Sequence, residues 1–225
     1  MCGRYTLGTF DWVDPAFHTD LASVGDLVKR PRYNIAPGQM VLALTRGAGG
    51  STVAESMHWG VKSTWKGGPP MLINARAETL AGSGFWNALL DDGRCAIPAD
   101  GFYEWRAAEG KGARKRPYWF SRTCGEGFAF AGLFQSGTGE GGTDSCAIIT
   151  LEPNDLVAGV HDRMPAMLTP DQVGQWLGDD TQQALAALQP FPSTEMTARA
   201  VAPAVGNADN EGPELIEPFE EATRF

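Results

Sequence analysis

The stretch Arg94-Cys-Ala-Ile-Pro-Ala-Asp-Gly-Phe-Tyr-Glu-Trp-Arg106 contains two short runs of apolar and aromatic residues, Arg94–Pro98 and Gly101–Arg106. Such runs are typical of β-strands when turn residues bound them. The pattern recurs on both sides and predicts further strands at Val41–Arg46, Val53–Trp59, Pro117–Arg122, Phe128–Phe134 and Cys146–Leu151. Glycine-rich segments at 47–50, 109–112 and 136–144 separate several of these runs, as hairpin loops do. The sequence therefore predicts a compact β-sheet or barrel.

Helices are fewer and short in this prediction. Residues 78–90 place Leu80, Phe85, Leu89 and Leu90 on roughly one helical face. Thr169-Pro-Asp-Gln172 fits a capping box that opens a helix over 170–177. Further helices are expected at 153–160 and 180–188. With no internal repeat and no linker, we predict an α+β fold: a single β-rich, barrel-like domain over residues 1–225, with a few short peripheral helices.

The charge is unevenly distributed. The 225 residues carry a net charge of −9, which at first argues against a nucleic-acid partner. Residues 1–149 hold 15 basic and 14 acidic side chains, whereas residues 150–225 hold 3 basic and 13 acidic ones. The neutral part can still hold a basic groove, and we expect most of the acidic third to face away from an anionic ligand.

Several classes of protein are disfavoured. No apolar run approaches the roughly 20 residues that cross a bilayer, and no signal-peptide core is present, so we expect a soluble, cytoplasmic protein with no membrane partner. The four cysteines and three histidines show no metal-ligand spacing. We therefore expect no metal, no other cofactor and no disulfide framework.

Cys2 directly follows Met1, and removal of Met1 would leave an α-amine and a thiol on one residue. Their reference pKa values are about 7.7–8.0 and 8.5, so both are partly reactive near neutrality. This 1,2-aminothiol condenses with aldehydes to give a thiazolidine. The alternative for Cys2 is a small buried thiol with a structural role.

Three other segments combine polar groups with a rigid backbone. In an extended stretch Asn74 and Arg76 share one face, although Arg76 is as readily explained by an ion pair with Glu78. Glu104 lies in an aromatic strand where desolvation would raise its pKa; the alternative is a solvent-facing carboxylate. His161 ends a short predicted helix and suits proton transfer, or is a hydrogen-bonded structural histidine.

These residues occur within motifs that run along nearly the whole chain: Met1-Cys-Gly-Arg-Tyr5, Arg32-Tyr-Asn-Ile-Ala-Pro-Gly38, Trp59-Gly60, Ile73-Asn-Ala-Arg-Ala-Glu-Thr79, Arg94-Cys-Ala-Ile-Pro98, Gly101-Phe-Tyr-Glu-Trp105, Pro117-Tyr118, Phe130-Ala-Gly-Leu133, Thr150, His161-Asp-Arg-Met-Pro165 and Val205-Gly-Asn207. In this order they resemble the SRAP family, the SOS response-associated peptidase domain. The segment Val61-Lys-Ser-Thr-Trp65 departs from the family pattern because it lacks a proline.

The resemblance implies a protein that acts at abasic sites in single-stranded DNA and crosslinks to the opened sugar. By matching, Cys2 carries the bond and Asn74, Glu104 and His161 line the reaction site. The DNA contacts that we expect from it are Arg4, Asn34, Pro37, Trp65, Arg76, Trp105 and Arg163. Trp65 and Trp105 are candidate stacking surfaces, and core packing is the alternative for each. We expect a monomer that is associated with the nucleoid when bound to DNA.

Two other classes of function remain open at this stage. An N-terminal-nucleophile or cysteine peptidase would use Cys2 as nucleophile and His161 as base, and removal of Met1 would be one such activity. A non-catalytic DNA-binding module would not need Cys2. Lyase activity by β-elimination is a side reaction that a Schiff base permits. The basic run Arg114-Lys-Arg116 is expected to be the solvated tip of a hairpin.

Overall fold

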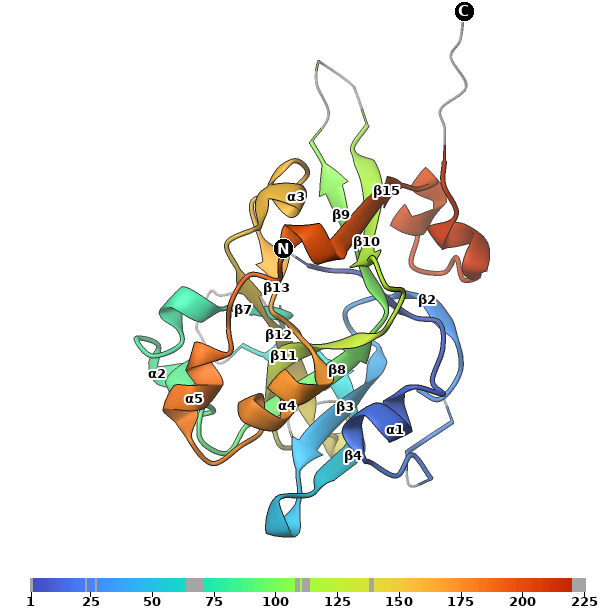
Figure 1. The fold of residues 1–225 in the computed structure, drawn as a ribbon. Coiled ribbons are helices and arrows are strands. Elements are labelled where there is room, and N and C mark those ends of the chain that lie inside the picture. Colours follow the sequence, from blue (N-terminus) through green and yellow to red (C-terminus); the bar gives the residue numbers. More distant parts are fainter. Residues whose placement is uncertain are drawn as a thin grey trace, which may run out of the picture.

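The structure is a computed structural model that describes residues 2–22, 24–26, 28–63, 71–107, 110, 114–137 and 140–219. Most of the strands in this part of the chain belong to two sheets (Figure 1). The first sheet has the order β15–β10–β9–β1–β2. Its strands are β15 (Met196–Ala200), β10 (Arg116–Arg122), β9 (Gly101–Arg106), β1 (Tyr5–Leu7) and β2 (Arg32–Ile35).

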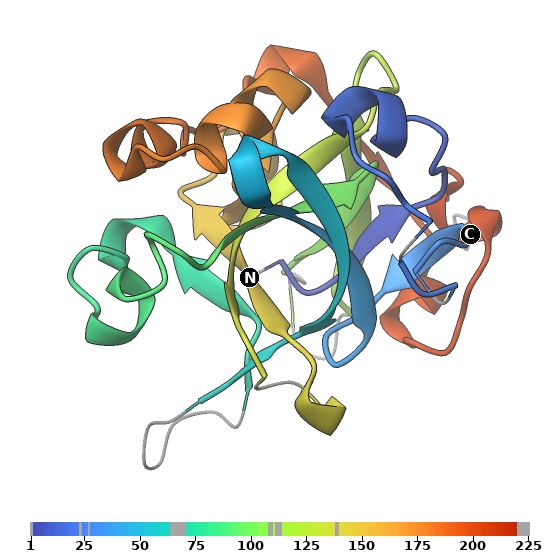
Figure 2. The ribbon, with the colours of Figure 1, turned by 90° about the horizontal axis from the view of Figure 1, so that it is seen from below.

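The second sheet closes on itself. Its order is β13–β12–β4–β3–β8–β11–β14, and β12 also pairs with β11, so that β12, β4, β3, β8 and β11 form a ring of strands (Figure 2). Each of these five strands has a hydrogen-bonded neighbour on both sides, which removes exposed edges. The bounds are β13 (Met164–Pro165), β12 (Ser145–Leu151), β4 (Thr52–Trp59), β3 (Met40–Arg46), β8 (Arg94–Ala99), β11 (Phe128–Gln135) and β14 (Met167–Leu168).

Short strands extend this ring. β7 (Asn74–Arg76) pairs in parallel with β12. A small separate sheet joins β5 (Val61–Lys62) to β6 (Met71–Leu72). All seven strands predicted from the sequence are present, each within one residue of its predicted ends. The predicted α+β, β-rich fold with few short helices is thus confirmed, with a ring of strands at its centre.

The helices are short. The α-helices are α1 (Val13–Phe17), α2 (Gly84–Asn87), α3 (Asp155–Ala158), α4 (Pro170–Trp176) and α5 (Thr181–Ala186). The 3-10 turns are Ala48–Gly50, Ala77–Thr79, Glu140–Gly142, Ser193–Glu195, Pro203–Gly206 and Pro213–Ile216. The capping box of α4 is formed as predicted, with Thr169 and Gln172 capping each other's backbone. Within the described residues no helix is long and apolar enough to cross a membrane.

The single helix predicted over 78–90 is wrong. The chain instead makes a 3-10 turn at Ala77–Thr79 and restarts at α2, whose N-cap Ser83 accepts a hydrogen bond from the Trp86 backbone. Gly82 and Gly84 flank that cap, and glycine lowers helix stability by about 1 kcal/mol relative to alanine. Of the predicted apolar face, Leu80 and Leu90 are buried and Phe85 and Leu89 are half-buried, whereas the buried Trp86 was not assigned to it.

Two clusters of apolar side chains stabilise the fold. The larger one fills the ring and the adjoining face of the first sheet, where Tyr5 packs edge-on against Trp59 and Phe130 at centroid distances of 5.3 and 5.5 Å. The smaller one lies on the other face of the first sheet, where the C-terminal segment covers Tyr103 and Trp119. The first sheet is therefore packed on both faces.

Arg94 attaches α4 and α5 to the ring. Its side chain is buried and donates hydrogen bonds to the carbonyl oxygens of Leu90, Trp176 and Gly178 and to the Thr181 hydroxyl. We expect Arg94→Met to lower the free energy of unfolding by about 3 kcal/mol or more, because it leaves several buried carbonyls without donors. Urea unfolding measures this.

A matched control for that variant is Arg46→Met. Arg46 is exposed and pairs with the exposed carboxylate of Asp179. Surface pairs contribute about 0–1 kcal/mol, so this control is expected to unfold at nearly the wild-type urea concentration. Equal losses in the two variants would contradict the structural role of Arg94.

Candidate functional site

Cys2 lies beside Glu104 because of the pairing between β1 and β9. Tyr5 is opposite Phe102 in this antiparallel pair, and the backbone N–H of Tyr103 donates to the carbonyl of Arg4 at 3.0 Å. The residues before β1 therefore run along the second half of β9. Cys2 is fully buried there. The first described residues lie over one mouth of the strand ring in both views (Figures 1 and 2).

Glu104 is an unusual carboxyl group for its place in a strand. It is only 2 % exposed, so the solvent-facing alternative is wrong for this residue. Burial raises its pKa to about 7, and the negative charge of Asp162 acts in the same direction. The Oε2 atom of Glu104 lies 3.7 Å from Nε2 of His161. Near neutral pH this carboxyl group therefore both donates and accepts protons.

His161 is held in place by the backbone that follows it. The Arg163 backbone N–H and carbonyl oxygen lie 3.0 and 3.3 Å from His161 Nδ1, and the other ring nitrogen, Nε2, faces Glu104. Burial lowers the pKa of His161, although Asp162, with a carboxylate oxygen 3.1 Å from Nδ1, opposes this effect. The ring is therefore mostly neutral at pH 7.

The Cys2 thiol is protonated at rest. Burial raises its pKa far above the ordinary value, and the nearby charge of Glu104 raises it further. A thiol held in this state is a poor general nucleophile. It becomes reactive only when a bound electrophile is placed against it and a neighbouring group accepts its proton.

Two other candidate residues, Asn74 and Arg76, lie in β7, which pairs with β12. Asn74 is opposite Ile148 and Arg76 is opposite Thr150 on the β7 side, whereas Pro165 of β13 is opposite Thr150 on the other side. Asn74 is half-buried and its Nδ2 donates to the carbonyl of Ile148 at 3.4 Å. Its Oδ1 atom is buried and has no hydrogen-bond partner within the described residues, which leaves an acceptor for a bound group. Ala75, which lies between Asn74 and Arg76 in the strand, is buried. This is expected if Asn74 and Arg76 share the other face.

The ion pair in this region joins Glu78 to Arg163, and not to Arg76 as in the alternative above. Arg163 binds the Glu78 carboxylate with both of its terminal nitrogens, at 2.8 and 3.0 Å, and donates to the carbonyl of Thr150 at 2.6 Å. The hydrogen bonds from Arg163 lower the pKa of Glu78. Arg76 is exposed. Of these two predicted DNA contacts, Arg163 uses its guanidinium for protein contacts, whereas that of Arg76 is exposed and more accessible to a phosphate.

Arg4 and Asn34 bind the C-terminal segment. Arg4 donates to Asn34 Oδ1 and to the carbonyl of Val205, each at 2.8 Å. Asn34 is buried and donates to the carbonyls of Asn207 and Asn210, both at 2.9 Å. These contacts give both side chains a structural role that the sequence did not indicate.

The remaining predicted contacts are dispersed. Trp105 packs on the smaller cluster with Tyr103, on the face of β9 opposite Glu104, and its ring centroid lies 6.0 Å from the Arg4 guanidinium carbon. Pro37 is half-buried in the turn after β2. Trp65 and Met1 lie outside the described residues, as does most of the loop 109–112.

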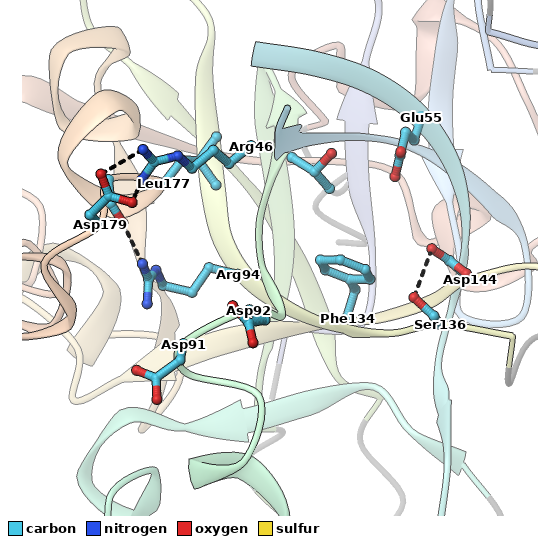
Figure 3. A pocket seen from close by; sticks show the side chains of 12 residues that line it. Arg46, Glu55, Asp91, Asp92, Arg94, Phe134, Ser136, Asp144, Leu177 and Asp179 are labelled. Carbon is cyan, nitrogen blue, oxygen red and sulfur yellow. Dashed lines mark hydrogen bonds and ion pairs between the residues drawn. The ribbon is translucent and has the colours of Figure 1, made fainter. Parts of the chain in front are cut away.

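A cavity of about 610 Å³ lies at the other mouth of the ring (Figure 3). It is bounded by the ends of β3 and β11 and the start of β8, whereas Thr150 lies near the opposite end of the ring strand β12. Burial raises the pKa of Glu55 here, and the neighbouring Asp144 adds to this. The charged lining is mainly acidic: Glu55, Asp91, Asp92, Asp144 and Asp179 against Arg46 and Arg94. This mouth therefore repels phosphate groups.

The sequence reasoning missed several residues that act around the site. These are Glu78 as the partner of Arg163, Thr150 as its anchor on β12, and Asp162 as a charge beside His161. Both Glu78 and Thr150 lie within the motifs quoted above, so the motifs were the available signal. Among the described residues no group of three or more His, Cys, Asp or Glu side chains is placed to hold a metal ion.

Comparisons with known proteins identify the relatives of this chain. Residues 1–208 match the family described as SOS response associated peptidase (SRAP). The abasic site processing protein YoqW of Bacillus subtilis (strain 168) is 36 % identical over 96 % of this chain and 99 % of its own length. The abasic site processing protein YedK of Escherichia coli (strain K12) is 32 % identical over 83 % of this chain and 84 % of its own length.

Solved structures share the fold. A crystal structure of a protein from Bacteroides thetaiotaomicron superimposes with a TM-score of 0.78 and covers 97 % of this chain and 100 % of its own, at 20 % identity. That likeness concerns the fold alone. On the family match and the identity to its relatives, this chain belongs to the SOS response associated peptidase (SRAP) family.

Proposed function

We propose that this protein recognises abasic sites in single-stranded DNA and bonds covalently to the opened sugar through Cys2, after Met1 has been removed. The observation that carries this proposal is the burial of an amino-terminal cysteine beside a carboxyl group of pKa about 7 and a neutral histidine. The names of the relatives, abasic site processing proteins, support the choice of substrate.

The reaction has two bond-forming steps. The α-amine of Cys2 attacks the aldehyde of the ring-opened sugar, and loss of water gives an imine. The thiol then adds across the imine: sulfur bonds to the carbon, the thiol proton ends on nitrogen, and a five-membered thiazolidine closes. No oxidant or cofactor is needed for either step.

The neighbouring residues have separate roles in this scheme. Glu104 moves protons at the hydroxyl that leaves as water and accepts the thiol proton, as suits a carboxyl group that titrates near pH 7. His161 assists opening of the sugar ring through Nε2. The open acceptor Oδ1 of Asn74 orients the amine through a hydrogen bond of about 1 kcal/mol.

The non-covalent contacts follow the family pattern in part. Arg76 is exposed and suits a flanking phosphate, whereas Arg4 and Arg163 offer phosphates only the donors not used in protein contacts. The buried Asn34 supports this surface by holding the C-terminal segment, and Pro37, Trp65 and Trp105 are proposed contacts for the bases. We propose that the protein acts as a cytoplasmic monomer on nucleoid DNA.

A denaturing gel of the protein incubated with abasic single-stranded DNA tests this function. We expect a slower, heat-stable species whose intact mass equals that of the Met1-free protein plus DNA, less one water. Absence of that species from Met1-free protein would reject the proposal. A cysteine peptidase is less well supported, because the raised pKa of Cys2 opposes the resting thiolate that such enzymes use.

The contact between Glu78 and Arg163 positions the His161 segment and allows a further prediction. In Glu78→Gln we expect crosslinking to slow on the order of 10-fold, because small displacements of a reacting group are costly. Single-turnover crosslinking rates measure this. The matched control is Glu126→Gln, which removes an ion pair with Arg122, an arginine as little exposed as Arg163, away from the site. Equal rates in both variants would show that the Glu78 contact is only structural.

A further inference from the structure

The hairpin formed by β9 and β10 carries basic and aromatic side chains beyond Glu104. In this antiparallel pair Phe102 is opposite Phe120, Glu104 is opposite Tyr118, and Arg106 is opposite Arg116. Directly opposite residues share one face of a sheet. On the face that presents Glu104, Tyr118 therefore lies beside it. The pair Arg106 and Arg116 follows on one side, and the buried stack of Phe102 on Phe120 lies on the other.

The two arginines gather around one aromatic ring. The guanidinium carbon of Arg106 lies 4.9 Å from the Tyr118 ring centroid, and that of Arg116 lies 6.0 Å from it. Tyr118 is half-buried and Arg106 is exposed. Arg116 is half-buried inside β10, so the prediction that residues 114–116 form a solvated hairpin tip is wrong for this residue.

This pair of positive charges is not neutralised within the described residues. Neither Arg106 nor Arg116 has an ion pair there; Arg116 Nη2 donates to the carbonyl of Phe219 at 3.4 Å, and its buried Nε has no partner. Like charges directly opposite each other on a sheet are destabilising. Such an arrangement is relieved when an anion binds between the two guanidinium groups.

Lys115 links this face to the reaction centre. It is exposed and directly precedes Arg116, the first residue of β10. Its charge lowers the pKa of both Glu104 and His161, which indicates that the hairpin contributes positive potential at the reacting groups. A polyanion that enters the site therefore meets basic side chains on this side too.

We propose that Arg106, Arg116 and Tyr118 form a subsite for the phosphodiester backbone of single-stranded DNA beside the abasic nucleotide. This inference rests on the proposed function, since it extends the same substrate along the Glu104 face. The ligand is a chain of phosphates, because a guanidinium binds phosphate oxygens with two parallel N–H donors. The Tyr118 ring keeps both guanidiniums together on the hairpin.

Equilibrium binding to single-stranded DNA that contains a tetrahydrofuran analogue of the abasic site tests the subsite. The analogue has no aldehyde, so fluorescence anisotropy reports non-covalent affinity alone. We compare the double variant Arg106→Gln/Arg116→Gln with the control Lys29→Gln/Arg30→Gln, which removes the same amount of positive charge. The control residues lie just before β2, whose first residue, Arg32, is opposite Leu7, so they lie away from Cys2.

We expect the hairpin variant to bind about 10-fold more weakly, with the salt dependence of log K reduced by about 1.4. The control is expected to stay within about twofold of wild type. The single variant Arg106→Gln changes only an exposed side chain, so its smaller loss is independent of folding. Unchanged salt dependence in the hairpin variant, or equal losses in the control, would overturn the subsite.

The two proposals fail in different ways. If the wild-type protein forms no covalent species with abasic DNA, the proposed function fails whatever the binding data show. If the wild type crosslinks but the hairpin variant binds the analogue with unchanged affinity and salt dependence, only the subsite fails.

Discussion

Replacement of Cys2 by alanine is expected to abolish the heat-stable adduct with abasic single-stranded DNA. Alanine keeps the α-amine, so the imine still forms, but no sulfur is present to close the thiazolidine. The imine hydrolyses during denaturation. Denaturing gels and intact-mass measurement of Cys2→Ala and wild type, each with Met1 removed, measure this difference.

Two controls define the chemistry of that result. Borohydride reduces imines, so the Cys2→Ala protein is expected to give a stable adduct only when borohydride is added. The exposed Cys124 is the matched control, and Cys124→Ala should crosslink like wild type. An undiminished adduct from Cys2→Ala without reductant would exclude Cys2 as the residue that closes the ring.

Glu104→Gln is expected to slow crosslinking by about 100-fold or more, the usual contribution of a general acid–base group. The amide has nearly the same shape but does not titrate. In wild type the rate should change with pH around 7, where the Glu104 carboxyl group titrates, and in the variant this change should disappear, which leaves only the dependence set by the Cys2 α-amine, whose reference pKa is about 7.7–8.0. Single-turnover rates between pH 5 and 9 test it, and a variant that retains the wild-type profile would contradict the assignment.

The same substitution, Glu104→Gln, should raise the stability of the fold although it slows crosslinking. The pKa of Glu104 is about 7 in the folded state and about 4.3 when unfolded, so the folded state binds the proton more tightly. Its contribution to stability is thus complete below the unfolded pKa and is lost as pH rises through 7. We expect the free energy of unfolding of Glu104→Gln to be higher than that of wild type by on the order of 2 kcal/mol at pH 8, with little difference at pH 4. Urea unfolding at both pH values measures this.

The strands of the ring were predictable because each is a continuous apolar or aromatic run. Runs such as Phe128–Phe134 and Cys146–Leu151 are buried on both sides, which leaves few alternatives. The short strands β1, β7 and β13 were not predicted. Each contains two or three residues and exists because it pairs with a distant strand, β9 or β12.

The sequence indicated candidate site residues but not their geometry. Motif positions indicated Cys2, Asn74, Glu104 and His161, and the aromatic setting of Glu104 indicated its raised pKa. The ion pair between Glu78 and Arg163 joins two segments 85 residues apart, so no local pattern reports it. The contacts of Asn34 with the C-terminal segment, and of Arg106 with Tyr118, depend in the same way on tertiary pairing.

The placement of Cys2 beside Glu104 and His161 has a consequence for the timing of activity in the cell. Ribosomes synthesise residue 2 at the start of translation, whereas β9 emerges later and residue 161 later still. A nascent or truncated chain that has lost Met1 therefore carries a cysteine with ordinary aldehyde reactivity but lacks the groups that we propose transfer protons. On the proposed function, we therefore expect crosslinking to a DNA lesion only from chains whose synthesis has passed the His161 segment and whose ring of strands has closed.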